Sequence, residues 1–347
     1  MLFFGLLLIV FILAATLSFF DDEDTRLKRD SYMAIVGILV LLAAFRPAGM
    51  DSDYDTYVEY YHGNTNQIVE FTFMGIAAVA HALFNSPLIL FFVYAVTSIC
   101  LRGYGIVRST SFWLLAVVVW MGNFYLYQDL TQIRVAVSSG IFLIAISLLA
   151  EKRRGAYITL ALLAGCFHYS AFILVALVFL GNKPLTQTGK IIIACIPAIG
   201  YVLYFMGFDP VMSLPIPWVQ DKIEAYEYLR DSGIAGDTIN VFNAVYMLRL
   251  LVFYVILWKY EILKDQVKPL PLLLKIFALS YFCFTAFSAL PVMSFRFAEL
   301  LGSVEVVLFP CLAFTVRPVA IGRLFVITVA FCCMMINVFY NGLLTFD

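Results

Sequence analysis

The chain has 347 residues, of which 63% are hydrophobic, and its 22 Lys and Arg against 23 Asp and Glu give a net charge of −1. A soluble globular chain is about half apolar and about a quarter charged, whereas here 13% of the residues are charged and the mean hydropathy is +0.95. This composition excludes a soluble enzyme, a disordered chain and a nucleic-acid-binding protein, and it indicates a polytopic membrane protein.

Apolar segments alternate with short polar ones along the whole sequence. Because a spanning helix needs about 20 apolar residues, we predict an all-α, polytopic integral membrane protein with about 10 spanning helices and one or two broken or re-entrant helical segments. The predicted spans are 1–20, 31–45, 87–105, 111–127, 133–150, 190–206, 240–259, 271–290, 300–316 and 319–340.

The first segment, Met1–Phe20, has no basic residue before it, and its positive charges follow at Arg26, Lys28 and Arg29. A cleaved signal peptide has the opposite polarity. We therefore expect a retained first helix with its N-terminus outside.

Two segments are ambiguous: 71–84 is short, and 156–181 is long and interrupted at Phe167–Ser170. If neither makes a net crossing, 16 of the 22 Lys and Arg face the cytoplasm and five lie outside. If both cross once, the partition becomes 11 against 10. The positive-inside rule favours the first topology, with 71–84 at the outer face and 156–181 as a broken hairpin.

We find no internal repeat and predict a single transmembrane domain, 1–347, with non-cytoplasmic loops at about 46–70 and 207–239. The second loop contains a helix-like run, Trp218–Arg230, and short polar turns near 125–134 and 291–296 face the same side. The seven cysteines lie inside apolar runs without metal-ligand spacing. We expect them to pack between helices, and we expect no metal and no cofactor.

Acids, tyrosines and one arginine gather in the first outer loop. The candidates there are Arg46, Asp51, Asp53, Tyr54, Tyr57 and Glu70. If 53–61 is helical, Tyr54, Tyr57 and Tyr61 share one face. Carboxylates accept hydrogen bonds from sugar hydroxyls and aromatic rings stack on sugar C–H faces, so the loop is a candidate sugar site. The alternative is a solvated acidic loop with interfacial tyrosines.

Arginines occur at four places in this charge-poor chain: Arg46, Arg134, Arg249 and Arg296. Gln132 and Arg134 open the predicted helix 133–150, whereas Arg249 lies ten residues into the span 240–259. The guanidinium fork suits a phosphate, so the four arginines are candidates to converge on one anionic ligand. For an arginine at the head of a span, the alternative is a side chain that reaches to the membrane interface.

His168 lies inside an apolar segment, between Phe167 and Tyr169. An ionisable residue at such a place is a candidate functional residue. The alternative is a neutral imidazole that hydrogen-bonds neighbouring helices.

These residues resemble the EpsG/Wzy-type family of bacterial polysaccharide polymerases, over about residues 40 to 310. The matching positions are Arg46, Gly49, Asp53–Tyr57, Glu70, Arg134, the basic turn 151–154, Phe167–Ala171 and Arg296. Asp51 and Asp53 are both candidates for the acidic residue of the family pattern.

The resemblance implies a multi-pass enzyme of the bacterial inner membrane. It would transfer a growing glycan from undecaprenyl pyrophosphate to the next lipid-linked repeat unit at the periplasmic face, making O-antigen, capsule or exopolysaccharide. The implied partners are the undecaprenyl-pyrophosphate-linked oligosaccharide and the lipid bilayer, with a chain-length regulator and a flippase as further candidates and no nucleic acid.

Within this reaction we expect His168 to act as base or to position the acceptor, and Asp53 and Glu70 to hold sugar hydroxyls. Arg134 and Arg296 would bind the pyrophosphate. An O-antigen ligase-like transferase is the main alternative, although the loop 207–239 is modest for one. A polysaccharide or lipid-linked sugar transporter is the other, although transporters carry internal repeats.

Overall fold

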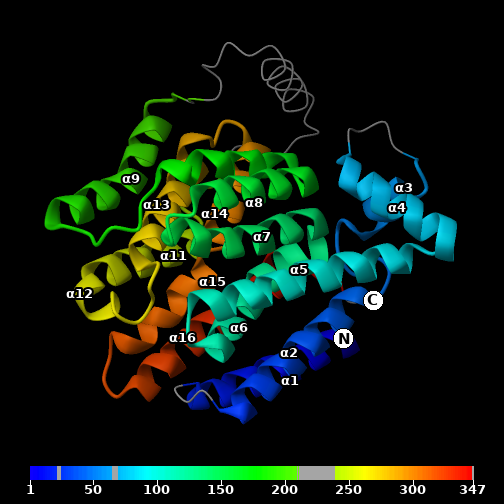
Figure 1. Ribbon diagram of the computed structural model, residues 1–347, viewed down its shortest axis with the longest axis horizontal. Helices are drawn as coiled ribbons and strands as arrows, with labels where there is room; N and C mark the ends of the chain where they lie inside the picture. The colour runs from blue at the N-terminus through cyan, green and yellow to red at the C-terminus, as the bar shows by residue number, and fades with distance from the viewer. Residues whose placement is uncertain (22–24, 65–68, 209, 211–238, 346–347) are drawn as a thin grey trace. The chain divides into compact units, whose positions relative to one another are not determined.

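The computed structural model describes residues 1–21, 25–64, 69–208, 210 and 239–345 (Figure 1). Every regular element in this part of the chain is a helix, which confirms the predicted all-α class. The predicted loop 207–239, with its run Trp218–Arg230, lies almost entirely outside the described residues.

The chain divides into two compact units. Unit 1 comprises Met1–Asn182, Glu261–Leu270 and Glu305–Asp347, and unit 2 comprises Lys183–Tyr260 and Pro271–Val304. The single domain expected over 1–347 stays a prediction.

Unit 1 contains most of the helices. Its elements are α1 (Leu2–Leu17), η1 (Ser18–Phe20), α2 (Arg26–Ala44), α3 (Tyr54–Tyr61), α4 (Phe71–Phe84), α5 (Pro87–Ser109), α6 (Trp113–Gly122), η2 (Tyr125–Thr131), α7 (Ile133–Ala150), α8 (Arg154–Phe167), η3 (Tyr169–Phe179), α15 (Glu305–Leu308), η4 (Phe309–Phe314), α16 (Val319–Met335) and η5 (Ile336–Tyr340). Unit 2 contains α9 (Gln187–Phe205), α11 (Ala244–Trp258), α14 (Pro291–Gly302) and all of α13 (Leu270–Ala286) except its first residue. The short helix α12 (Tyr260–Leu263) has its first residue in unit 2 and the rest in unit 1.

Six helical runs among the described residues are long and apolar enough to cross a membrane: Leu2–Phe20, Pro87–Ser109, Ile133–Ala150, Gln187–Phe205, Pro291–Phe314 and Val319–Tyr340. Six further apolar helices have 10–17 residues. The chain is thus a polytopic membrane protein, and the count of about ten spans stays a prediction. Two local expectations are wrong, because neither polar turn is present. Residues 125–131 form the largely buried π-helix η2, and residues 291–296 form the first turns of α14, where Pro291 is well suited to the first position of a helix.

Local sequence explains where several helices begin. Thr25, Ser86 and Asn243 each precede a helix and accept a hydrogen bond from a backbone N–H in its first turn, at 3.1–3.3 Å. Side-chain caps of this kind satisfy N–H groups that have no partner inside the helix. Pro87 then follows Ser86 at the first position of α5.

The centre of unit 1 is a close contact between α5 and α7. A Cβ built on Gly140 of α7 would lie 3.0 Å from the backbone oxygen of Ser98 and 3.2 Å from the backbone nitrogen of Arg102. On Gly105 of α5, a Cβ would lie 2.9 Å from Cβ of Leu143. These two glycines allow the helices to approach closely, as small residues do in membrane helix pairs.

The interruption predicted inside 156–181 is a helix break. α8 ends at Phe167, His168 has extended backbone angles (φ −152°, ψ 118°), and the 3₁₀ helix η3 starts at Tyr169. η3 folds back along α8, since the Tyr157 hydroxyl donates to the Leu174 carbonyl at 2.6 Å. The expected broken hairpin is therefore confirmed, and His168 lies at its tip.

Candidate functional site

The loop before α3 contains a buried ion pair. Arg46 Nε donates to Asp51 Oδ2 at 2.7 Å, and Arg46 Nη1 donates to the Ala43 carbonyl at 3.0 Å. The guanidinium lies 4.3 Å from the centre of the Phe91 ring. Burial raises the pKa of Asp51 and outweighs the opposing effect of Arg46. The structure thus pairs Asp51, and not Asp53, with Arg46.

Asp53 lies at the N-terminal end of α3 and is half-buried. Its backbone N–H donates to Asp51 Oδ1 at 3.1 Å. Asp53 therefore lies nearer the surface than Asp51, and its role toward a sugar stays a prediction.

Residues 54–61 form the helix α3, so the condition for Tyr54, Tyr57 and Tyr61 to share a face is met. Tyr54 stacks on Phe91 with ring centres 4.6 Å apart, and Tyr57 meets the same ring edge-on at 6.5 Å. Tyr61 is buried on the same helix. Tyr57 and Tyr61 are buried, so the role of these rings toward a sugar stays a prediction.

Glu70, Arg134 and His168 come together in unit 1. Glu70 precedes α4, Arg134 is the second residue of α7, and His168 is the break between α8 and η3. Arg134 Nη1 donates to Glu70 Oε2, and His168 Nδ1 lies 2.9 Å from Glu70 Oε1. The Tyr169 backbone N–H also points at Oε1, at 3.4 Å. The sequence had assigned each of the three a role, and the structure shows that they form one cluster.

Electrostatics keep Glu70 ionised. Burial alone would raise its pKa, but the hydrogen bond with His168 and the charge of Arg134 together lower it to about 2. An ionised carboxylate only accepts hydrogen bonds. In a neutral imidazole Nδ1 must then carry the proton, and Nε2 keeps the basic lone pair.

Two further hydrogen bonds fix the elements that carry this cluster. The Thr72 hydroxyl of α4 donates to the Cys166 carbonyl of α8 at 2.7 Å. The Ser138 hydroxyl of α7 donates to the Ala164 carbonyl of α8 at 2.8 Å. Because α8 ends at Phe167, both bonds hold the last turn before His168.

Arg134 lies among aromatic rings. Its guanidinium carbon is 5.6 Å from the ring centres of both Tyr57 and Tyr60 and 5.9 Å from that of Phe73. Its side chain is 16% exposed, against 3% for Glu70. Part of the Arg134 side chain is therefore accessible, although its Nε is buried, and its role toward an anionic ligand stays a prediction.

Gln132, the other predicted contact at the start of α7, is half-buried and separates η2 from α7. Its carbonyl accepts a hydrogen bond from the Ala136 N–H at 3.0 Å, which starts the helix. Its side chain keeps its predicted role toward the substrate.

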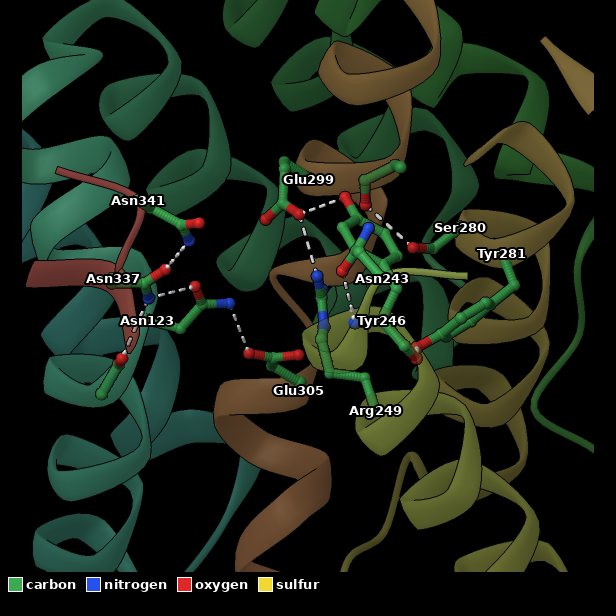
Figure 2. A network of polar contacts seen from close by, with 12 residues as sticks. Asn123, Asn243, Tyr246, Arg249, Ser280, Tyr281, Glu299, Glu305, Asn337 and Asn341 are labelled. Atoms are coloured by element: carbon green, nitrogen blue, oxygen red, sulfur yellow. Dashed lines mark hydrogen bonds and ion pairs between the residues drawn. The ribbon is translucent and has the colours of Figure 1, made fainter. Parts of the chain in front are cut away.

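In unit 2, Arg249 belongs to a buried cluster (Figure 2). Arg249 Nη1 donates to Glu299 Oε1 at 2.8 Å, and the Tyr246 hydroxyl donates to the same oxygen. A Cβ built on Gly302 would lie 2.5 Å from Arg249 Nη2, so this position must be a glycine or the guanidinium must move. The sequence singled out Arg249 as a charged residue inside a span but did not identify its partner Glu299.

Arg296 is exposed on α14, one turn before Glu299. The expected convergence of four arginines joins residues of unit 1, Arg46 and Arg134, with residues of unit 2, Arg249 and Arg296. It stays a prediction.

The sequence did not reveal a second polar network in unit 1. Arg102 is buried inside α5 and donates to Gln128 Oε1 at 2.6 Å. Asp129 Oδ2 accepts from Trp120 Nε1 at 2.8 Å. The one available signal was the pair of polar residues, Gln128 and Asp129, at the end of an apolar run.

Asn123, Glu305 and Asn337 form another unpredicted group in unit 1, which Figure 2 also draws. Asn123 Nδ2 donates to Glu305 Oε1 and Asn337 Nδ2 donates to Asn123 Oδ1, both at 3.0 Å. These bonds join α6, α15 and η5. In the part of the chain that the structure describes, no group of three or more His, Cys, Asp or Glu could hold a metal ion.

The family model described as the EpsG family matches residues 31–345. No curated protein and no solved structure matches the chain. The matched range includes Glu70, Arg134 and His168 as well as most of both units. The protein therefore belongs to the EpsG family, which indicates a membrane protein with a role of the polysaccharide-polymerase type.

Proposed function

We propose that the protein polymerises glycan repeat units that are carried on undecaprenyl pyrophosphate, at the periplasmic face of the bacterial inner membrane. The observation that carries the proposal is the contact of His168 Nδ1 with the ionised Glu70, at 2.9 Å. Family membership supports the general class of reaction. The positive-inside partition of the sequence supports the outer face.

In the reaction, a hydroxyl of the acceptor sugar attacks the anomeric carbon of the donor glycan. The bond from that carbon to the pyrophosphate oxygen breaks, and undecaprenyl pyrophosphate leaves with the electron pair. His168 Nε2 takes the hydroxyl proton as the new glycosidic bond forms. No other reactant is needed, because the pyrophosphate linkage supplies the free energy.

Glu70 has a different role in this proposal from the sugar-holding role expected for it. Its two oxygens are engaged by His168 and Arg134. A carboxylate on Nδ1 orients the imidazole and stabilises the imidazolium that forms after proton transfer, as in other carboxylate–histidine pairs. Asp53, half-buried at the start of α3, remains the candidate for holding a sugar hydroxyl.

Arg134 is the proposed pyrophosphate contact. Guanidinium has five N–H donors, of which Nη1 contacts Glu70, and Tyr57 also forms a hydrogen bond with the group. The remaining donors of a partly exposed side chain can bind the leaving group, where fixed positive charge stabilises the developing negative charge. The same cluster then serves both the proton and the leaving group.

The test is a purified-protein assay with lipid-linked repeat units, in which product length is measured on a gel. His168→Ala should lower turnover by about 100-fold or more, the range for loss of a general base. His62→Ala is the matched control, because His62 is exposed at the end of α3 and has no role in the proposal.

Normal chain length from folded His168→Ala protein would overturn the assignment of the base. A ladder of products distinguishes a polymerase from a ligase-like enzyme, which would add a preassembled glycan to a different acceptor in one step.

A further inference from the structure

The π-helix η2 leads directly into the active-site helix α7. η2 ends at Thr131, Gln132 follows, and Arg134 is the second residue of α7. A π-helix is rare and less regular than an α-helix, and such segments are frequent near functional sites. The position of Arg134 therefore depends on how η2 is held.

Four buried side chains hold η2, and we call them the η2 anchor: Arg102, Gln128, Asp129 and Ser139. Arg102 of α5 donates through Nη2 to Gln128 Oε1 at 2.6 Å and also to the Ser139 hydroxyl of α7. Ser139 Oγ donates in turn to Gln128 Oε1 at 2.7 Å. Side chains of α5, η2 and α7 thus meet at the amide oxygen of Gln128.

The second half of the η2 anchor is an ion pair. Arg102 Nη1 lies 3.7 Å from Asp129 Oδ2, and both side chains are almost fully buried. The same Asp129 oxygen accepts a hydrogen bond from Trp120 Nε1 of α6. The other end of η2 is also fixed, since the Tyr125 hydroxyl donates to the Leu39 carbonyl of α2 at 2.8 Å.

The η2 anchor and the active site share α7. Ser139 belongs to the η2 anchor, while the neighbouring Ser138 donates to the Ala164 carbonyl near the end of α8. α5 and α7 approach closely at Gly140, where a Cβ would lie 3.2 Å from the backbone nitrogen of Arg102. A shift of α7 against η2 would therefore move Arg134 relative to Glu70 and His168.

Stability gives no reason for this arrangement. Burying an ion pair costs desolvation free energy, and replacing such a pair by apolar side chains of similar volume is often neutral or stabilising. An ionisable pair inside an apolar helix bundle is expected to have a function. A network of directional hydrogen bonds fixes the relative positions of the helices that it joins, whereas an apolar core does not.

We infer that Arg102, with Gln128, Asp129 and Ser139, is a positioning network that sets Arg134 for binding of the donor pyrophosphate. This inference rests on the proposed function, because it acts through the assigned role of Arg134. None of the four residues touches the reacting atoms.

A double-mutant cycle tests it. Arg102→Met/Asp129→Leu removes both charges together, so no buried charge is left unpaired. The KM for the lipid-linked donor should rise by about 10- to 100-fold, the range for loss of an orienting partner. In an Arg134→Ala background the same double substitution should give no further rise, because residues that act through one another are not additive.

The matched control is another buried ion pair of unit 1, Lys28 with Asp21, whose charged atoms lie 3.4 Å apart. Lys28→Met/Asp21→Leu should leave the donor KM unchanged even if it lowers the melting temperature. If the Arg102 double variant does not fold, Ser139→Ala replaces it in the cycle, with an expected KM rise of about fivefold for one lost hydrogen bond.

An unchanged donor KM, or KM effects that multiply with those of Arg134→Ala, would overturn the positioning role. If Arg134→Ala itself leaves the donor KM unchanged, the pyrophosphate role of Arg134 and the η2 anchor both fail. If Arg134→Ala raises the KM but the anchor variant does not couple to it, only the anchor fails.

Discussion

Each unit contains a glutamate that pairs with an arginine and with one further donor. In unit 1, Glu70 accepts from Arg134 with one oxygen and contacts His168 with the other. In unit 2, a single oxygen of Glu299 accepts from both Arg249 and Tyr246. The two clusters use the same ion pair and differ in the third residue.

In the proposed function, the third residue is what distinguishes the chemistry of the two clusters. A histidine changes charge near neutral pH, whereas a tyrosine ordinarily has a pKa of about 10 and cannot serve as a base there. Exposure differs too, since the side chain of Arg134 is 16% exposed and that of Arg249 is 3% exposed. An arginine in an apolar segment therefore does not by itself identify a ligand site, and its partners must be known.

The largest expected effect separates the two glutamates. Glu70→Gln removes the negative charge beside His168 and can favour the wrong imidazole tautomer, so turnover should fall by about 100- to 10,000-fold, as for removal of the charge in a triad. Glu299→Gln should instead lower abundance or melting temperature, because Arg249 is left without its carboxylate. The measurement is initial rate per folded protein. Equal losses of turnover in both variants would show that the clusters do not differ in role.

The next effect compares the two arginines. Arg134→Lys keeps the charge but loses the planar fork, so the donor KM should rise by about tenfold. Arg249→Met/Glu299→Leu replaces the buried pair of unit 2 by apolar side chains and should change the donor KM by less than about twofold if the pair is structural. A KM rise in the second variant as large as in the first would support the sequence-based prediction that Arg249 contacts the ligand.

A smaller effect distinguishes the two aspartates of the first loop. Asp51→Asn leaves the Arg46 charge buried without its carboxylate, so the free energy of unfolding should fall by about 3–5 kcal/mol, seen as a lower melting temperature. Asp53→Asn should leave the melting temperature unchanged and raise the KM for the acceptor by about fivefold, the value of one lost hydrogen bond. The reverse pattern would show that Asp53 is the structural acid.

The smallest effect concerns pH. The pKa of Glu70 is lowered to about 2, from an ordinary value of 4.5. A lowered pKa adds stability that is fully present above about pH 4.5 and is lost as pH falls toward 2. Between pH 5 and 8 the titration of Glu70 should therefore change neither stability nor rate. Loss of the Glu70-dependent stability above pH 5, measured as the melting-temperature difference between wild type and Glu70→Gln, would contradict this.

The sequence by itself determined the class of the protein and several local features. Apolar runs predicted a helical membrane protein, because lipid leaves helices as the structure that satisfies backbone groups within one segment. The tyrosine spacing showed which side chains would share a face if 53–61 were helical, and the interruption at Phe167–Ser170 predicted the helix break at His168. Arg134 and His168 were found by their polarity beside or inside apolar segments, and Glu70 was found as an acid of the first outer loop.

Only the tertiary structure decided which of these residues act together. Glu70 and His168 are 98 positions apart, and Arg102 and Gln128 are 26 apart. No periodicity within a helix relates such residues, because their contact depends on how separate helices pack. The choice of Asp51 as the partner of Arg46 likewise followed from the shape of one loop. Composition and spacing fix local structure through neighbouring residues, whereas ion pairs form between whichever side chains the packed helices bring together.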